Sequence, residues 1–237
     1  MRALYVKQAG DPPVLEIRDV LIPEAGPRQV LVHVTACGFC HHDRSVMAGL
    51  LRRGVAPDVI LGHEISGVVE TAGSDVTGLK TGDRVVSILT EACGRCDRCD
   101  NGREHRCREG QGIGHGCDGG FAEYVRVREA ALSPVSEEIP PQQACLLTCP
   151  RGVALQAAQD VARVTPGDQV VVTGASGGLG VHGLQVAKVL GGTTLAVTSS
   201  EGKMASLLEM GVDEVVPVGD LDFSEIVRAL TEERGAD

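Results

Sequence analysis

Four cysteines lie close together in the segment CGRCDRCDNGREHRC at 93–107. Their spacing is Cys-x2-Cys-x2-Cys-x7-Cys, and the Gly, Asp and Asn residues between them favour turns. Four thiolates spaced in this way can surround a zinc ion as a tetrahedron. An iron–sulfur cluster is disfavoured, because its bacterial pattern, C-x2-C-x2-C-x3-C-P, has a shorter last spacing and a final proline. The spacing therefore predicts a structural zinc site made by Cys93, Cys96, Cys99 and Cys107.

A glycine-rich segment, TGASGGLG at 173–180, follows the apolar run VVV and precedes LQVAKVLG. A strand, a glycine turn and a helix in this order are typical of a dinucleotide-binding site. The glycines let the backbone approach a pyrophosphate at the N-terminus of the helix. The residues expected to contact the cofactor are Gly177, Gly178, Leu179 and Gly180.

The end of the next expected strand bears on the choice between NAD and NADP. NAD-specific sites place Asp or Glu about 20 residues after the glycine turn, where it binds the ribose hydroxyls. Ser199 occupies that position, so no carboxylate there repels a 2′-phosphate, and Lys203 could pair with one. We expect a preference for NADP, while Glu201 and the lack of an arginine leave NAD open.

These motifs fall in two regions with different patterns. Residues 1–140 contain many short apolar or alternating segments with turns between them, which predicts an all-β, barrel-like domain. Residues 141–237 alternate helix and strand patterns, which predicts a parallel, doubly wound sheet. Only about three of the six strands usual for a nucleotide-binding sheet are supplied, so this second domain is expected to be truncated. The expected strands lie at 3–6, 14–20, 30–38, 65–73, 83–90, 122–135 and 213–218, and a helix is expected over 144–162.

Composition limits the possible partners. The net charge is −10 and no Lys/Arg-rich run is present, which disfavours binding to nucleic acid or to a membrane surface. We find no secretory signal and no apolar stretch of membrane-spanning length, so a cytoplasmic location is expected. Nine cysteines then indicate metal or thiol chemistry and not a disulfide framework.

Five motifs occur in one order: CGFCHHD at 37–43, GHE at 62–64, the four-cysteine segment, DGGFAEY at 118–124 and the glycine-rich segment. In this the chain resembles the zinc-containing medium-chain dehydrogenase/reductase superfamily, over essentially its whole length. The resemblance implies a GroES-like catalytic domain over 1–140 and a partial Rossmann domain over 141–237. It also implies a longer full-length protein that forms a homo-oligomer.

The same resemblance implies a second, catalytic zinc, with Cys40, His63 and Cys149 as its ligands and thus two zinc ions per chain. Such a set leaves a fourth position for a substrate oxygen or water. Glu64 is similar to the family's acidic neighbour of the metal, and Asp43 to the carboxylate that orients the zinc-bound histidine. Without the resemblance, a cysteine in an apolar segment, such as Cys149, is more typical of a small core residue.

One position departs from the family pattern. Alcohol dehydrogenases of this type carry Ser or Thr where this chain has His42, and some carry a further histidine where it has Ser45. The unperturbed pKa of histidine lies near neutrality, so His42 could serve as acid or base. The alternative is an altered proton relay and a reaction other than simple alcohol oxidation.

The resemblance therefore implies an oxidoreductase that uses zinc and NADP or NAD on a small-molecule alcohol, aldehyde or ketone. An enoyl or quinone reductase of the same superfamily is an alternative, although such relatives generally lack the catalytic zinc ligands. A non-catalytic, zinc-stabilised fragment stays open as a third possibility, because part of the nicotinamide pocket would lie beyond residue 237.

Overall fold

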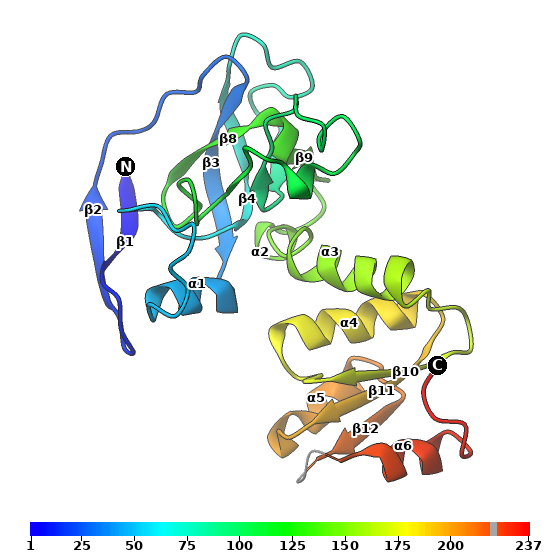
Figure 1. Cartoon of the computed structure of the whole chain (residues 1–237). Coiled ribbons are helices and arrows are strands. Elements are labelled where there is room, and N and C mark those ends of the chain that lie inside the picture. The colour runs from blue at the N-terminus through cyan, green and yellow to red at the C-terminus, as the bar shows by residue number, and fades with distance from the viewer. Residues whose placement is uncertain (219–221) are drawn as a thin grey trace. The chain divides into compact units, whose positions relative to one another are not determined.

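The computed structural model of the chain describes residues 1–218 and 222–237 and divides into two units (Figure 1). The first unit is Met1–Cys149 and the second is Pro150–Asp237. The division thus follows Cys149 and not residue 140, where the sequence suggested it. Helix α2 (Pro141–Ala144) explains the difference, because Ser66 Oγ of the first unit donates a 2.9 Å hydrogen bond to the Pro141 carbonyl. The expected fold class, a β domain followed by an α/β domain, is confirmed.

A five-stranded antiparallel sheet forms the core of the first unit, in the order β8-β3-β4-β5-β9. Its β-branched side chains alternate and suit a pleated, half-buried surface. Val30, Val32, Val69 and Val125 are each no more than 1% exposed. The strands are β3 (Gln29–Gly38), β4 (Glu64–Ala72), β5 (Arg84–Ser87), β8 (Tyr124–Arg128) and β9 (Leu132–Pro134).

Two of the predicted strands are longer than the strands in the structure. The segment 122–135 divides because Glu129–Ala131 forms a 3₁₀ turn, after which β9 pairs at the opposite edge of the sheet from β8. The segment 83–90 likewise ends its first strand at Ser87. Two small antiparallel pairs complete the unit, β1 (Arg2–Gln8) with β2 (Val14–Asp19) and β6 (Thr90–Glu91) with β7 (Gln111–Gly112).

Helix α1 (His41–Met47) follows β3 directly and was not predicted. Its inner face buries Val46 and Met47 against Val59 and Leu61. Because α1 is fixed in this way, the turn at Cys40 between β3 and α1 is held against the start of β4.

The second unit contains a parallel sheet in the order β10-β11-β12. Leu184, Ala196 and Leu207 form its buried core. The single helix expected over 144–162 is interrupted, because proline lacks an N–H donor and disfavours helical geometry in the residue before it. Pro150 instead begins α3 (Pro150–Leu155), which continues into a π-helical turn over Gln156–Val161. The remaining elements are β10 (Gln169–Thr173), α4 (Gly178–Val189), β11 (Thr193–Thr198), α5 (Met204–Glu209), β12 (Glu214–Pro217) and α6 (Ser224–Leu230).

Within the described residues, every helix is too short or too polar to cross a lipid bilayer.

Candidate functional site

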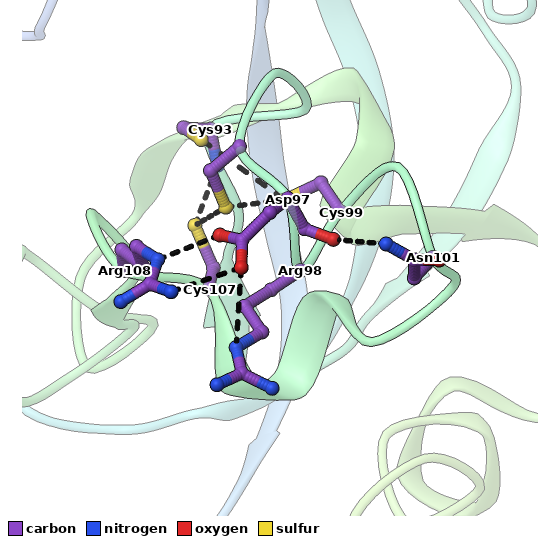
Figure 2. Close-up of polar contacts among 8 residues, drawn as sticks. Cys93, Asp97, Arg98, Cys99, Asn101, Cys107 and Arg108 are labelled. Carbon is purple, nitrogen blue, oxygen red and sulfur yellow. Dashed lines mark hydrogen bonds and ion pairs between the residues drawn. The ribbon is translucent and has the colours of Figure 1, made fainter.

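The four-cysteine lobe, defined as residues 93–107, brings its sulfur atoms together (Figure 2). All four lie within 4.8 Å of one another, and all nine cysteines of the chain are free thiols. The sulfur atoms are separated by 3.6 Å in Cys96–Cys99, 3.9 Å in Cys96–Cys107 and 4.0 Å in Cys93–Cys99. Sulfurs bound about 2.3 Å from a tetrahedral zinc would lie about 3.8 Å apart. The donor set therefore fits a zinc ion in both chemistry and spacing.

Polar contacts on the outside of the lobe hold its turns. Arg108 makes a two-pronged contact with the Asp97 carboxylate at 2.6 and 2.9 Å, and Asn101 Nδ2 donates to the Asp97 carbonyl at 2.6 Å. Figure 2 shows Arg108 and Asn101 reaching Asp97 from opposite sides. The Arg108 backbone N–H lowers the pKa of the Cys96 thiol to about 6, and the Cys93 N–H, 3.2 Å from Cys107 Sγ, lowers the pKa of Cys107. Both effects favour the thiolate form that binds metal.

A second cluster gathers Cys40, His63, Glu64 and Cys149, whose donor atoms all lie within 4.8 Å of one another. His63 and Glu64 are 2% and 4% exposed, so this cluster is more buried than the first. The structure thus places the three expected ligands together, and it adds the Glu64 carboxylate as a fourth potential donor.

Pairing between β3 and β4 explains how two of these segments meet. Gly38, the last residue of β3, pairs with Glu64, the first residue of β4, so Cys40 and His63 lie just beyond the paired ends. A Cβ at Gly38 would overlap the Glu64 carboxylate and approach Leu146 Cδ2 at 3.1 Å. Glycine at this position therefore makes room for the buried carboxylate.

Two hydroxyl groups hold the third segment in place. Thr148 Oγ1 donates a 2.6 Å hydrogen bond to the Ser87 carbonyl on β5. Ser87 Oγ in turn donates to the His63 carbonyl at 3.3 Å. Cys149, next to Thr148, is thereby fixed beside His63, although 86 positions separate the two residues in the sequence.

Asp43 lies under this cluster and is fully buried. Its Oδ2 accepts a 2.9 Å hydrogen bond from Cys40 N, and its Oδ1 accepts one of 3.2 Å from Gly62 N. The same Oδ1 lies 3.5 Å from His63 Nδ1. Asp43 thus joins the Cys40 turn to the residues that precede β4, and its carboxylate faces the His63 ring.

The electrostatics of the second cluster favour a cation. Burial, reinforced by the Glu64 carboxylate, raises the pKa of Cys149 to about 12 and also raises the pKa of Cys40. Loss of the proton from either thiol would therefore place a negative charge next to the Glu64 carboxylate in this partly buried space. A divalent cation would offset this cost, and the donor set of Cys, His and Glu is one that zinc accepts.

His42 lies beside the second cluster, on α1. Its ring centroid is 5.2 Å from that of His63 and 5.0 Å from that of His115. Burial lowers the pKa of His42, and the nearby His63 and His115 rings lower it further by a smaller amount. His115 was not among the predicted residues, and no motif could have indicated it, because it comes from a loop 73 positions away.

In the second unit, the glycine-rich segment forms the turn between β10 and α4. Gly177 caps α4, Gly178 is its first residue, and Leu179 is 53% exposed. A Cβ at Gly178 would meet nothing within 4 Å, whereas one at Gly180 would strike the Gly174 carbonyl and Ala175. Gly180 is therefore needed for close packing of the helix on the turn, and a Cβ at Gly177 would also come within 3.1 Å of the Gly174 carbonyl, whereas the space at Gly178 is open to a ligand.

Ser199 and Lys203 lie near this turn. Ser199 directly follows β11, which runs parallel to β10, so both strand ends lie at one edge of the sheet. Lys203 Nζ is 3.5 Å from the Ser176 carbonyl within the turn. The ammonium group is thus close to the backbone expected to hold a cofactor phosphate.

A β domain with two cysteine-rich clusters and a βαβ unit with an open glycine turn define a zinc-binding dehydrogenase class of protein. Family models match at residues 26–137 (alcohol dehydrogenase GroES-like domain) and at 178–237 (zinc-binding dehydrogenase). The chain belongs to the zinc-containing medium-chain dehydrogenase/reductase superfamily.

Two curated relatives and one solved structure illustrate the similarity. An acryloyl-coenzyme A reductase of Sulfurisphaera tokodaii is 34% identical over 85% of this chain and 60% of its own length. An NAD-dependent alcohol dehydrogenase of the same organism is 35% identical over 100% of this chain and 70% of its own length. The crystal structure of an NAD-dependent alcohol dehydrogenase superposes with a TM-score of 0.93, at 36% identity, over 100% of this chain and 69% of that one. The chain thus spans about two thirds of the length of these proteins.

Proposed function

We propose that the protein is a zinc-dependent oxidoreductase that transfers a hydride between a nicotinamide cofactor and an alcohol, aldehyde or ketone. The observation that carries this proposal is the buried convergence of Cys40, His63 and Cys149 with Glu64. Similarity to alcohol dehydrogenases supports it. A zinc ion held by this set would polarise the substrate oxygen, and nicotinamide would carry the hydride.

The residues around the cluster have distinct roles in this proposal. Asp43 orients His63 and holds the Cys40 turn, so that the donors stay in place before metal or substrate arrives. His42 offers a ring nitrogen next to the cluster, where related enzymes are expected to have a hydroxyl. Glu64 balances the charge of the bound cation from within the buried site.

We further propose a second zinc in the four-cysteine lobe, with a structural role. Metal analysis of the purified chain tests both sites together. We expect two equivalents of zinc, with one lost in Cys93→Ser and the other lost in Cys40→Ser. A Cys117→Ser variant is the matched control, because Cys117 belongs to neither cluster, and it should keep both equivalents. A single equivalent that survives Cys40→Ser would rule out the catalytic zinc.

For the cofactor we propose NADP(H), with NAD(H) as the alternative that the relatives' names favour. Support comes from Ser199 in place of a carboxylate and from Lys203 beside the glycine turn. Lys203→Ala should weaken NADPH binding by about tenfold, the scale of one charge-assisted contact, and leave NADH binding unchanged. Lys80→Ala, which removes the same charge from an exposed position of the first unit, is the control and should change neither affinity. Tighter binding of NADH than of NADPH by the unaltered chain would reverse this assignment.

Reduction of an α,β-unsaturated thioester is a second candidate, because an acryloyl-coenzyme A reductase is among the relatives and His42 replaces the expected hydroxyl. Assays of the chain with NADPH or NADH should separate the two candidates. Carbonyl reduction that disappears in Cys40→Ser favours the first, and enoyl-thioester reduction that persists in Cys40→Ser favours the second. If neither cofactor binds, the chain is a non-catalytic, zinc-stabilised protein.

A further inference from the structure

Three groups from separate segments form a hydrogen-bonded chain that leads away from the second cluster. His42 Nε2 lies 3.0 Å from His115 Nδ1, and His115 Nε2 lies 3.1 Å from the Arg53 carbonyl oxygen. The two rings meet edge to face, with an interplanar angle of 77°.

The position of His115 is fixed by its backbone as well as by its ring. Its N–H donates to the Gly112 carbonyl at 3.1 Å, and its carbonyl accepts a 2.8 Å hydrogen bond from Ala56 N. Gly54 leaves room for the ring, because a Cβ there would come within 3.1 Å of His115 Nε2. The ring is thus held by the same loop that supplies the Arg53 carbonyl.

The carbonyl oxygen determines the direction of the chain. A carbonyl can only accept a hydrogen bond, so His115 Nε2 must carry a proton. A neutral imidazole has one N–H, which makes His115 Nδ1 an acceptor. His42 Nε2 must then be the donor to it, and His42 Nδ1 is left as the nitrogen with the lone pair.

We propose that His115 is a positioning residue that holds His42 in the Nε2–H form and leaves Nδ1 as the hydrogen-bond acceptor of a ring whose centroid lies 5.2 Å from that of His63. An acceptor nitrogen here could receive the hydroxyl proton of an alcohol substrate or of the cofactor ribose. An N–H at the same place could not accept either proton. The role in recognising a hydroxyl rests on the function proposed above, but the hydrogen-bond direction does not.

Nuclear magnetic resonance of the zinc-loaded chain, with ¹⁵N-labelled histidine, tests the direction without any turnover. We expect the shared proton on His42 Nε2, a coupling across the hydrogen bond to His115 Nδ1, and a proton on His115 Nε2. The His42 signals are assigned by their absence in His42→Gln. A shared proton located on His115 Nδ1 would overturn the proposal.

Variants at position 115 test the positioning role. In His115→Phe, the His42 Nε2 proton should exchange with solvent about fivefold faster, as expected for loss of a hydrogen bond worth ~1 kcal/mol. His115→Asn, which keeps a short side chain with an acceptor oxygen, should restore slow exchange. His105→Asn, an exposed histidine of the lobe, is the control and should change nothing. Unchanged exchange in His115→Phe would contradict the role, and the wild-type proton positions decide the matter if that variant does not fold.

The failure of this proposal can be distinguished from the failure of the proposed function. Expected proton positions in a chain that binds no nicotinamide cofactor would refute the oxidoreductase and leave the His115 arrangement standing. Carbonyl reduction by a chain whose shared proton lies on His115 Nδ1 would support the oxidoreductase and refute the proposed role of His115.

Discussion

The two groups of side chains proposed to bind metal in this protein are assembled in different ways. The lobe takes all four sulfurs from one continuous segment, 93–107, most of which lies at the surface. The second cluster takes its metal-ligating side chains from three segments that only the folded sheet brings together, and two of them, His63 and Glu64, are buried. We therefore predict that a metal would organise the chain in the lobe, whereas in the second cluster the folded chain would organise the site before a metal binds.

The surroundings of each cluster support this contrast. The second cluster is fixed by Asp43, Thr148 and Ser87 through hydrogen bonds that do not involve a metal. The lobe is flanked by a two-residue strand pair, β6 with β7, and it contains a 3₁₀ turn, Glu104–Arg106, in which no residue is buried. The ion pair between Asp97 and Arg108 is exposed. A segment with so little apolar burial would depend on a bound metal for its structure.

The largest expected effect is therefore that of metal removal. Chelation should abolish amide hydrogen-exchange protection across the lobe, because structural zinc contributes about 10 kcal/mol or more to the folding of comparable small sites. Strands β3 and β4 should keep their protection, since their valine core contains no metal ligand. Hydrogen exchange with mass spectrometry measures both regions in one sample. Equal loss of protection in β4 and in the lobe would break the contrast.

The next effect tests whether the second cluster is organised in advance. Asp43→Asn leaves the volume unchanged but removes the negative charge that faces His63 Nδ1. Loss of such a partner weakens metal binding by about 10- to 100-fold. Competition with a chromophoric chelator measures the metal affinity of each site. Only the affinity of the second cluster should fall, and that of the lobe should stay unchanged. Asp118→Asn is the control, because that carboxylate also accepts a backbone N–H but lies outside the cluster. A loss at both sites would show that Asp43 supports the domain as a whole.

A third prediction compares glycines from the two regions. Gly38→Ala forces a methyl group against the Glu64 carboxylate, and overpacking of a buried site costs about 1–3 kcal/mol. Gly102→Ala on the lobe meets nothing within 4 Å, but its φ of 66° is unfavourable for alanine, with a cost of about 1–2 kcal/mol. Urea unfolding gives both values. Gly38→Ala should also weaken metal binding at the second cluster, and an unchanged affinity there would show that the carboxylate can move without consequence.

The same contrast explains what the sequence could predict. The lobe is local, so the spacing of its cysteines was enough to predict the four sulfurs as a group. The second cluster is not local: Cys149 alone resembles a core residue, and only the family resemblance grouped it with Cys40 and His63. Nothing in the sequence indicated His115, because its contact with His42 depends on how a loop folds back over α1.

Errors in the predicted elements have a similar origin. The segment 122–135 does contain strand residues on both sides of the 3₁₀ turn at Glu129–Ala131, but the two strands lie at opposite edges of the sheet. The periodicity of apolar residues does not indicate such a change of partner. The helix expected over 144–162 was a different error, because Pro150 is visible in the sequence and the effect of proline on the preceding residue is general. The effect of Pro150 on the preceding residue therefore predicts an interruption of the helix, although the Ala, Leu and Gln content of the segment favours a continuous one.

The smallest expected effect concerns the ion pair between Asp97 and Arg108 on the lobe. The Arg108 guanidinium lowers the pKa of Asp97, so the stabilisation is complete above the unfolded-state pKa, about 3.9, and is lost as the pH falls through the lower folded-state pKa. Asp97→Asn should therefore lower the stability of the lobe slightly and equally at pH 7 and pH 5.5. Added salt should shrink the difference, because both side chains are more than half exposed.

The midpoint of thermal cobalt release from a cobalt-loaded lobe measures this effect, with Glu109→Gln as the control for another exposed ion pair, that with Arg95. A shift for Asp97→Asn as large as that for Gly102→Ala would mean that the surface contacts, and not the metal, hold the lobe together. A small, salt-sensitive shift leaves the four sulfurs and their metal as the element that organises this region.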